Sequence, residues 1–168
     1  GQLEQVYRPG EESIVGVFYL YDENGFLTQR LMRPNFQDNF VNVAASYEYN
    51  TLGNISKITY STSNEEGAYF EEQSYTYDKR GYIVSEGHNV NIGEEGTEAY
   101  RQSSSSKVYA YDSVGRLVQV QSNAAAENST VTYGYDSAGN RTGMIKDGTS
   151  TSYSFNILNQ LISSGSQV

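Results

Sequence analysis

A nine-residue pattern, Tyr-x-Tyr-Asp-x-x-Gly-x-Leu, occurs in six copies along the chain and constrains its fold more than any other feature. The clearest copy runs from Tyr109 to Leu117. Tyr109 and Tyr111 are two residues apart, so they point to the same face of a β-strand. Asp112 and Gly115 are the first and fourth residues of a turn, which suits a type I turn followed by a G1 bulge. The pattern therefore predicts a β-hairpin in which Tyr111 pairs with Leu117.

Each copy is called a repeat, and the copies are numbered in chain order. Repeats 1 to 6 span residues 19–27, 47–55, 75–83, 109–117, 133–141 and 153–161. The turn residues expected to have a structural role are Asp22, Gly25, Asn50, Gly53, Asp78, Gly81, Asp112, Gly115, Asp136, Gly139, Asn156 and Asn159. Asn159 replaces glycine, and asparagine tolerates the left-handed conformation. We therefore expect a positive φ at this turn position in all six repeats.

Cross-strand pairs are expected to stabilise one register of each hairpin, by about 0.2–1 kcal/mol per pair. The apolar pairs are Tyr21/Leu27, Tyr49/Ile55, Tyr77/Ile83, Tyr111/Leu117 and Phe155/Leu161. In repeat 5 Arg141 replaces leucine opposite Tyr135, where its guanidinium can lie on the tyrosine ring.

The tandem pattern resembles the YD repeat of Rhs proteins, a family of bacterial Rhs and wall-associated proteins, toxin-complex C components and extracellular teneurins. The matches run from Tyr19 to Leu161. Counting the hairpins predicts an all-β fold, an antiparallel meander of long hairpins with about thirteen strands. So many strands are expected to curl. The resemblance implies that the curved or spiralling sheet is an arc of a YD-repeat shell.

The chain is expected to form a single array of repeats over residues 1–168, as a fragment of a longer protein. Residues 1–3 match residues 115–117, so we expect the chain to start inside a repeat, although Gly1 fits a tag remnant equally well. Successive repeats start between 20 and 34 residues apart. The length differences are expected at the opposite edge of the sheet, in turns at 33–39, 63–67, 93–96, 123–128 and 147–148.

Composition limits the classes of function. Leu, Ile, Val and Phe make up only about a fifth of the chain, and sixteen tyrosines supply the remaining apolar surface. The net charge of −9 and the pI near 4.5 argue against nucleic acid and anionic membrane surfaces as partners. There is no cysteine, and no stretch predicts membrane insertion.

No catalytic residue, metal site or cofactor is expected. His88 is the only histidine and lies in a polar stretch, so we expect an exposed strand or loop residue. The paired glutamates, such as Glu71 and Glu72, are interpreted as solvated charge at the sheet edge. The segment that starts at Asp22 lacks the later ligands of a calcium loop, because Phe26 stands at its fifth position.

The first tyrosines of the repeats have two interpretations. They are Tyr19, Tyr47, Tyr75, Tyr109, Tyr133 and Tyr153. They either pack on each other as the inner layer of the sheet or contact glycans through their rings. Their expected cross-strand partners are Gln29, Lys57, Ser85, Gln119, Gly143 and Ser163, which would make the row polar-rimmed.

The leading hypothesis is a non-enzymatic structural scaffold from a bacterial cell-surface or secreted YD-repeat protein. By resemblance, the parent protein encloses or displays a cargo or effector region. The partners would be the remaining repeats, the cargo, and further copies through self-association. The alternative is a carbohydrate- or cell-surface-binding module that contacts polysaccharide through its tyrosines. An acid-pair hydrolase ranks third.

Overall fold

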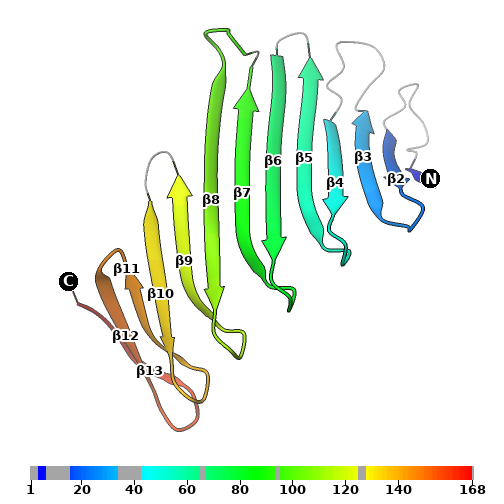
Figure 1. Cartoon of the computed structure of the whole chain (residues 1–168). Helices are drawn as coiled ribbons and strands as arrows, with labels where there is room; N and C mark the ends of the chain where they lie inside the picture. The colour runs from blue at the N-terminus through cyan, green and yellow to red at the C-terminus, as the bar shows by residue number, and fades with distance from the viewer. Residues whose placement is uncertain are drawn as a thin grey trace. The chain divides into compact units, whose positions relative to one another are not determined.

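The computed structural model describes residues 4–6, 16–33, 43–64, 67–93, 95–124 and 128–167. Regular structure in these ranges consists of β-strands (Figure 1). The thirteen strands are β1 (Glu4–Val6), β2 (Gly16–Tyr21), β3 (Leu27–Arg33), β4 (Val43–Tyr49), β5 (Ile55–Asn64), β6 (Gly67–Tyr77), β7 (Ile83–Ile92), β8 (Arg101–Tyr111), β9 (Leu117–Ala124), β10 (Ser129–Tyr135), β11 (Arg141–Lys146), β12 (Thr149–Phe155) and β13 (Leu161–Gln167). Over the described residues, no helix has the length and apolar character needed to cross a membrane.

The strands follow each other in the sheet in chain order, from β1 to β13. Every pair with a described register is antiparallel. In each of the six repeats, a glycine- or asparagine-containing turn joins the two strands of the hairpin. The predicted all-β antiparallel meander of long hairpins with thirteen strands is confirmed.

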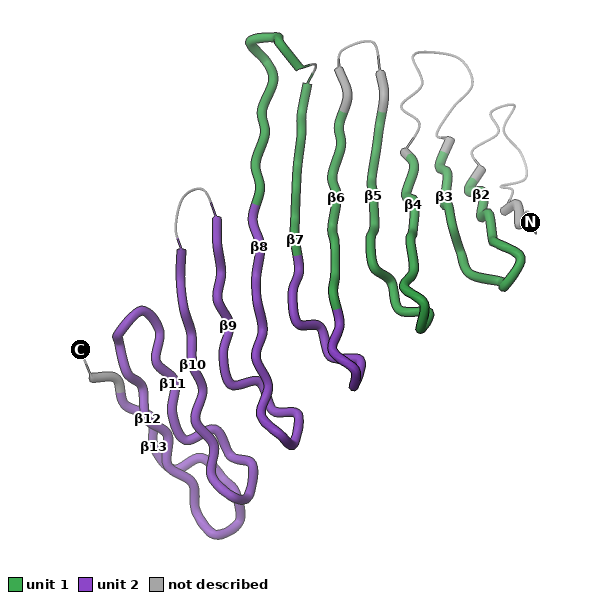
Figure 2. The backbone as a smooth tube through the Cα atoms, viewed as in Figure 1, with its two compact units in different colours: residues 1–76, 87–104 green, residues 77–86, 105–168 purple. Residues whose placement is uncertain are grey.

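The chain divides into two compact units (Figure 2). Unit 1 comprises residues 1–76 and 87–104, and unit 2 comprises residues 77–86 and 105–168. The boundary runs across β6, β7 and β8, so each of these strands contributes residues to both units. The turns of repeats 1 and 2 belong to unit 1, and those of repeats 3 to 6 belong to unit 2. The single array over residues 1–168 stays a prediction.

Within each unit, the turns of the repeats lie at the same edge of the strands (Figure 1). At the opposite edge, the predicted turn at 147–148 joins β11 to β12, with φ of 50° at Asp147 and 88° at Gly148. Two positive φ values are what a type I′ hairpin requires. The connection between β7 and β8 contains Gly93 and Gly96, also at positive φ. The other three predicted turns include residues outside the described ranges.

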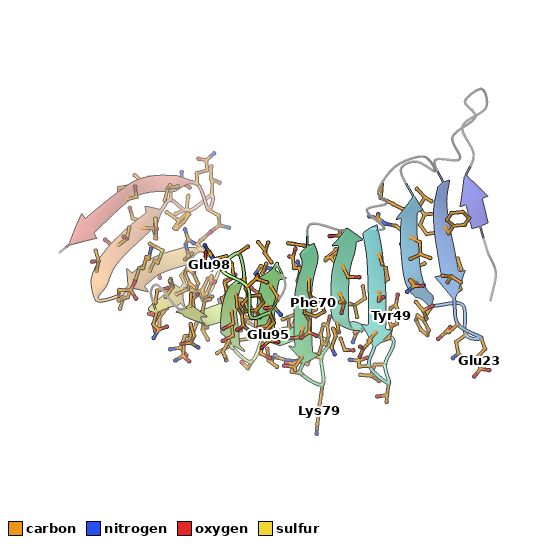
Figure 3. The ribbon with its side chains drawn as sticks, turned by 90° about the horizontal axis from the view of Figure 1, so that it is seen from above. Glu23, Tyr49, Phe70, Lys79, Glu95 and Glu98 are labelled. Carbon is orange, nitrogen blue, oxygen red and sulfur yellow. The ribbon has the colours of Figure 1, made fainter. Side chains whose placement is uncertain are left out.

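Side chains project from both faces of the strands (Figure 3). Among the described residues only Ala45 is buried, with 1% of its surface exposed. The first and second tyrosines of the repeats are half-buried. Within the described ranges, side-chain packing along the strands therefore provides most of the apolar contact, because the side chains described there form no deep core.

Candidate functional site: the repeat turns and seams

The turn of repeat 4 shows how the pattern closes a hairpin. The backbone N–H of Asp112 donates to the Arg116 carbonyl at 2.9 Å, and the Gly115 N–H donates to the Asp112 carbonyl at 3.1 Å. The Asp112 Oδ1 accepts from the N–H groups of Val114 at 3.0 Å and Arg116 at 2.8 Å. Gly115 has φ of 89°, a conformation that costs other L-residues energy. Asp112 and Gly115 thus both stabilise the turn of repeat 4.

All six repeats share this turn. The first turn residue donates its N–H to the residue after the turn glycine at 2.8–3.0 Å in every repeat. Its Oδ1 accepts from the N–H of that same residue at 2.8–3.0 Å. The fourth turn residues have positive φ: Gly25 86°, Gly53 81°, Gly81 85°, Gly115 89°, Gly139 89° and Asn159 59°. The prediction of six left-handed residues is confirmed. Asparagine can replace aspartate at Asn50 and Asn156 because only the Oδ1 acceptor is required.

In the five repeats whose hairpin register is described, a bulge follows the turn and fixes the register. The predicted pairs Tyr21/Leu27, Tyr49/Ile55, Tyr111/Leu117 and Phe155/Leu161 are confirmed, and Tyr135 pairs with Arg141. The pairing shifts by one residue immediately before each of these pairs. The register of the Tyr77/Ile83 pair stays a prediction.

The predicted partners of the first tyrosines are wrong by one residue. Tyr19, Tyr47, Tyr109, Tyr133 and Tyr153 lie opposite Arg30, Ile58, Val120, Met144 and Ser164. The expected partners were Gln29, Lys57, Gln119, Gly143 and Ser163. The bulge adds one residue to the return strand, which moves every later residue to the next pairing position. Three of the five observed partners are apolar, so this row is less polar than expected. The pairing of Tyr75 with Ser85 stays a prediction.

Neighbouring repeats are joined by a contact that we call a seam. In three seams, the second tyrosine of one repeat donates its hydroxyl to a backbone carbonyl of the preceding repeat. The hydrogen bonds are Tyr49 to Leu27 at 2.9 Å, Tyr111 to Ile83 at 2.9 Å and Tyr135 to Leu117 at 2.8 Å. The acceptor is always the last residue of the preceding repeat. Partial burial raises the pKa of Tyr49, which further favours the protonated form that donates this hydrogen bond.

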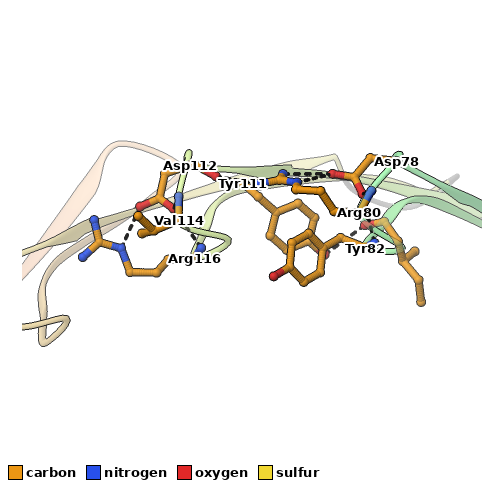
Figure 4. Close-up of polar contacts among 8 residues, drawn as sticks. Asp78, Arg80, Tyr82, Tyr111, Asp112, Val114 and Arg116 are labelled. Carbon is orange, nitrogen blue, oxygen red and sulfur yellow. Dashed lines mark hydrogen bonds and ion pairs between the residues drawn. The ribbon is translucent and has the colours of Figure 1, made fainter.

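The residue after the turn glycine completes each of these seams. Phe26 contacts the ring of Tyr49, with centroids 4.7 Å apart, and Tyr82 stacks on Tyr111 at 5.0 Å (Figure 4). In the next seam the Arg116 guanidinium lies 4.8 Å from the centre of the Tyr135 ring. Aromatic and cation–π contacts of this kind contribute about 0.5–1.5 kcal/mol each.

The turn glycine of the later repeat leaves space for this residue. A Cβ atom built on Gly115 would lie 2.9 Å from Cζ of Tyr82, closer than such atoms normally approach. A Cβ atom on Gly53 would lie 3.1 Å from Cζ of Phe26. At these two positions glycine serves both the turn conformation and the seam.

Polar side chains also link the turns along the edge in unit 2. Arg80 Nη1 donates to the Asp112 carbonyl and Arg116 Nη1 donates to the Asp136 carbonyl, both at 3.0 Å. Arg116 Nε also donates to Asp112 Oδ2 at 2.6 Å. The hydrogen bond from the Arg116 N–H is the main reason why the pKa of Asp112 lies below its ordinary value. Arg116 therefore binds both within its own repeat and across a seam.

Arg141 contacts different rings from the one predicted. Its guanidinium lies 5.5 Å from the centre of the Tyr133 ring and 4.9 Å from that of Tyr153. The predicted contact with Tyr135 is not formed, although Arg141 pairs with that residue in the register. Arg116 already covers the Tyr135 ring, so Arg141 lies on its other aromatic neighbours.

All six tyrosines considered for glycan contact are half-buried. They are Tyr19, Tyr47, Tyr75, Tyr109, Tyr133 and Tyr153. The Tyr75 hydroxyl donates to Gln73 Oε1 at 2.8 Å. Glycan contact by these residues stays a prediction.

A polar cluster on β6 and β7 was not predicted. The Glu71 carboxylate accepts hydrogen bonds from the Tyr69 hydroxyl and from Gln73 Nε2, and His88 Nε2 lies 2.8 Å from its Oε1. These hydrogen bonds lower the pKa of Glu71, and the bond from Tyr69 has the largest effect. The alternation of Tyr69, Glu71 and Gln73 along one strand was a signal that they share a face.

The interpretation of Glu71 and Glu72 as charge at the sheet edge is wrong. Both lie within β6, where consecutive residues point to opposite faces. Glu72 binds Lys57 at 3.7 Å, and Lys57 also lies 3.4 Å from Glu48. In the described ranges, no group of three or more His, Cys, Asp or Glu residues is arranged to hold a metal ion.

The turn residues were predicted from the sequence, whereas the seams were not. The signal was present, because aromatic or arginine residues follow the turn glycine in repeats 1, 3 and 4. Each half-buried tyrosine hydroxyl also needed an acceptor.

The meander, the shared turn and the seams define a tandem β-hairpin repeat protein, in which one structural unit recurs along a sheet. The model of the family described as Teneurin YD-shell matches residues 16–160. The chain belongs to this family, and the predicted relation to YD-repeat proteins is confirmed. A search of curated proteins found no match. The fold and the family make the chain a shell-like structural repeat segment.

Proposed function

We propose that the chain is a non-enzymatic scaffold from a secreted or cell-surface protein of bacterial type. Its hairpins would form part of a wall that encloses or displays a cargo or effector region of the parent protein. The proposal combines the family membership with the resemblance to bacterial Rhs proteins. The remaining repeats and the cargo are the proposed partners.

The recurrence of the seam is the observation that carries this proposal. The second tyrosines use their hydroxyls on backbone carbonyls, and their rings lie against the preceding repeat. The Tyr133 and Tyr153 rings each have the Arg141 guanidinium against them. Aromatic groups committed to their neighbours stabilise a sheet. A glycan platform would instead need free ring faces.

Alanine substitutions of first tyrosines test the proposal. We expect Tyr109→Ala and Tyr133→Ala each to lower the free energy of unfolding by about 2 kcal/mol, because a half-buried aromatic ring is removed. Ser137→Ala, at an exposed turn position, is the control and should change it by less than about 0.5 kcal/mol. Denaturant unfolding gives these values.

Binding of the unmodified chain to bacterial and host polysaccharides is measured in parallel. Saturable binding that both tyrosine variants lose, with unchanged thermal stability, would overturn the scaffold role. That outcome would favour the carbohydrate-binding module.

A further inference from the structure

The polar cluster on β6 and β7 places an imidazole beside a carboxylate from the neighbouring strand. Tyr69, Glu71 and Gln73 alternate along β6, so their side chains share one face of the sheet within unit 1. His88 on β7 reaches the same face, because its Nε2 lies 2.8 Å from Oε1 of Glu71. Two such atoms can hold either a shared proton or a metal ion between them.

Two other side chains of the cluster hold the Glu71 carboxylate in place. The Tyr69 hydroxyl donates to its Oε2, and Gln73 Nε2 donates to its Oε1 at 3.1 Å. The hydrogen bond from Tyr69, with smaller effects from Gln73 and His88, lowers the pKa of Glu71 and favours the carboxylate. The same hydrogen bond raises the pKa of Tyr69, so the phenol keeps its proton and stays a donor. Carboxylates that bind metal ions are commonly oriented by such donors.

Both potential ligands are open to water. The side chain of His88 is 45% exposed and that of Glu71 is 21% exposed. The chain supplies two ligands, because no third His, Cys, Asp or Glu residue in the described ranges is grouped with them to hold a metal ion. Water molecules therefore have to provide the remaining ligands, and the exposure of the pair gives them access.

The distance between the two ligand atoms favours one coordination geometry. Metal bonds to imidazole nitrogen and carboxylate oxygen are about 2.0 Å long. With bonds of that length, two ligand atoms lie about 2.8 Å apart when the angle at the metal is about 90°, and about 3.3 Å apart in a tetrahedral site. The observed 2.8 Å therefore matches tetragonal coordination by nitrogen and oxygen, which is typical of Cu²⁺. Zn²⁺ prefers the tetrahedral arrangement.

We propose that His88 and Glu71 bind a Cu²⁺ ion on this face of unit 1. The ion lies between His88 Nε2 and Glu71 Oε1, while Tyr69 and Gln73 keep the carboxylate oriented. The imidazole binds through an unprotonated Nε2 and carries its hydrogen on Nδ1. Among divalent first-row ions, Cu²⁺ also has the highest affinity for a given set of nitrogen and oxygen ligands. This site is separate from the seams and goes beyond the proposed scaffold role.

A copper titration of the full chain tests the site, because His88 is the only histidine. The chain is used without a histidine tag. Isothermal titration calorimetry with Cu²⁺ at neutral pH should show saturable binding, and the electron paramagnetic resonance spectrum should show coupling to an imidazole nitrogen. His88→Ala should abolish both signals. Zn²⁺ should bind at least about 10-fold more weakly than Cu²⁺.

Two adjacent glutamates of β6 provide a matched pair of variants. Glu71→Gln removes a ligand and should weaken Cu²⁺ binding by more than about 10-fold. Glu72→Gln should leave the affinity unchanged, because Glu72 points to the opposite face and binds Lys57 at 3.7 Å. Tyr69→Phe removes a donor that orients the carboxylate, so it should weaken binding about 10-fold while the imidazole signal stays. Circular dichroism verifies that each variant is folded.

Three results would overturn the proposal. They are no saturable Cu²⁺ binding by the unmodified chain, unchanged binding in His88→Ala, and equal affinities of Glu71→Gln and Glu72→Gln. Tighter binding of Zn²⁺ than of Cu²⁺ would overturn the assignment of the metal. The scaffold role would stand in each case, because the stability of the tyrosine variants tests it.

Discussion

Gly115 lies where backbone conformation and available space both restrict the side chain. Its φ of 89° disfavours any residue with a Cβ atom, and Tyr82 occupies the space where that atom would lie. Gly139 has the same φ of 89°, but nothing lies within 4 Å of its Cβ position. The two glycines therefore separate the conformational requirement from the steric one.

We expect Gly139→Ala to lower the free energy of unfolding by about 1 kcal/mol, the cost of the left-handed conformation. Gly115→Ala should cost about 1 kcal/mol more, because the Tyr82 ring must move away from Tyr111. Denaturant unfolding of both variants checks this difference. Equal losses of unfolding free energy in the two variants would show that the Tyr82 ring does not restrict the side chain at position 115.

The lowered pKa of Asp112 predicts that part of the folding stability is lost in acid. Its pKa is lower in the folded chain than in the unfolded chain, first because of the hydrogen bond from the Arg116 N–H. The folded state therefore favours the carboxylate. The resulting stabilisation is fully present above the unfolded pKa of about 3.9 and is lost as the pH falls through the folded pKa.

The melting temperature should accordingly fall as the pH is lowered below about 4. Asp112→Asn keeps the Oδ1 acceptor, as at Asn50 and Asn156, and should reduce this dependence. Melting curves of both proteins between neutral and acidic pH measure the effect. If the melting temperature depends on pH equally in both proteins, the Asp112 carboxylate has no such role.

At the scale of the hairpin, each repeat is completed by its neighbour. The turn and its bulge are local, whereas the seam needs a hydroxyl from the next repeat and a planar side chain from the preceding one. In the seam between repeats 4 and 5, Tyr135 and Arg116 supply these groups. In repeat 6 the second tyrosine is replaced by Phe155, which has no hydroxyl. The seam between repeats 5 and 6 instead contains the Arg141 guanidinium on the Tyr153 ring and a hydrogen bond of 2.9 Å from Asn140 Nδ2 to Asn159 Oδ1.

Tyr135→Phe should lower the free energy of unfolding by about 0.5–1.5 kcal/mol, because it leaves the Leu117 carbonyl without its hydroxyl donor. Tyr133→Phe is the matched control on the same strand and face, and it should have a smaller effect. Denaturant unfolding of the two variants gives the comparison. A larger loss for Tyr133→Phe would argue against the seam.

The hairpins were predictable from sequence because their determinants are local. Asp112 and Gly115 lie three residues apart, and turn chemistry alone fixes their roles. The partner of Tyr109 was missed, because a bulge moves the register by one residue and the prediction counted pairs without it. The position of Arg141 depends on which neighbouring ring Arg116 already covers, and that depends on a contact between repeats. Spacing within one repeat carries no information about such contacts.

At the scale of the whole molecule, stability should approach a sum over repeats and seams. Each described seam joins sequence-adjacent repeats, and among the described residues only Ala45 is buried. Repeat proteins with nearest-neighbour contacts behave in this additive way. A substitution in one seam should therefore leave the energetics of a remote seam unchanged.

The double variant Tyr49→Phe/Tyr135→Phe tests this independence. These residues lie in different units and share no partner. We expect its loss of unfolding free energy to equal the sum of the single losses within about 0.5 kcal/mol. Denaturant unfolding of the unmodified chain, the two single variants and the double variant provides the double-mutant cycle. A larger deviation would mean that the seams are coupled through the sheet.

The direction of the seam hydrogen bond determines how such a chain can grow by gene duplication. The hydroxyl always comes from the later hairpin and the carbonyl from the earlier one. Exchanging repeats 2 and 6 would place Phe155 beside Leu27, where it has no hydroxyl to donate. Hairpins are therefore not interchangeable modules, and a copied hairpin fits only beside a neighbour with the matching group. Insertions avoid this restriction when they fall in the connections opposite the turns, where the spacing already varies.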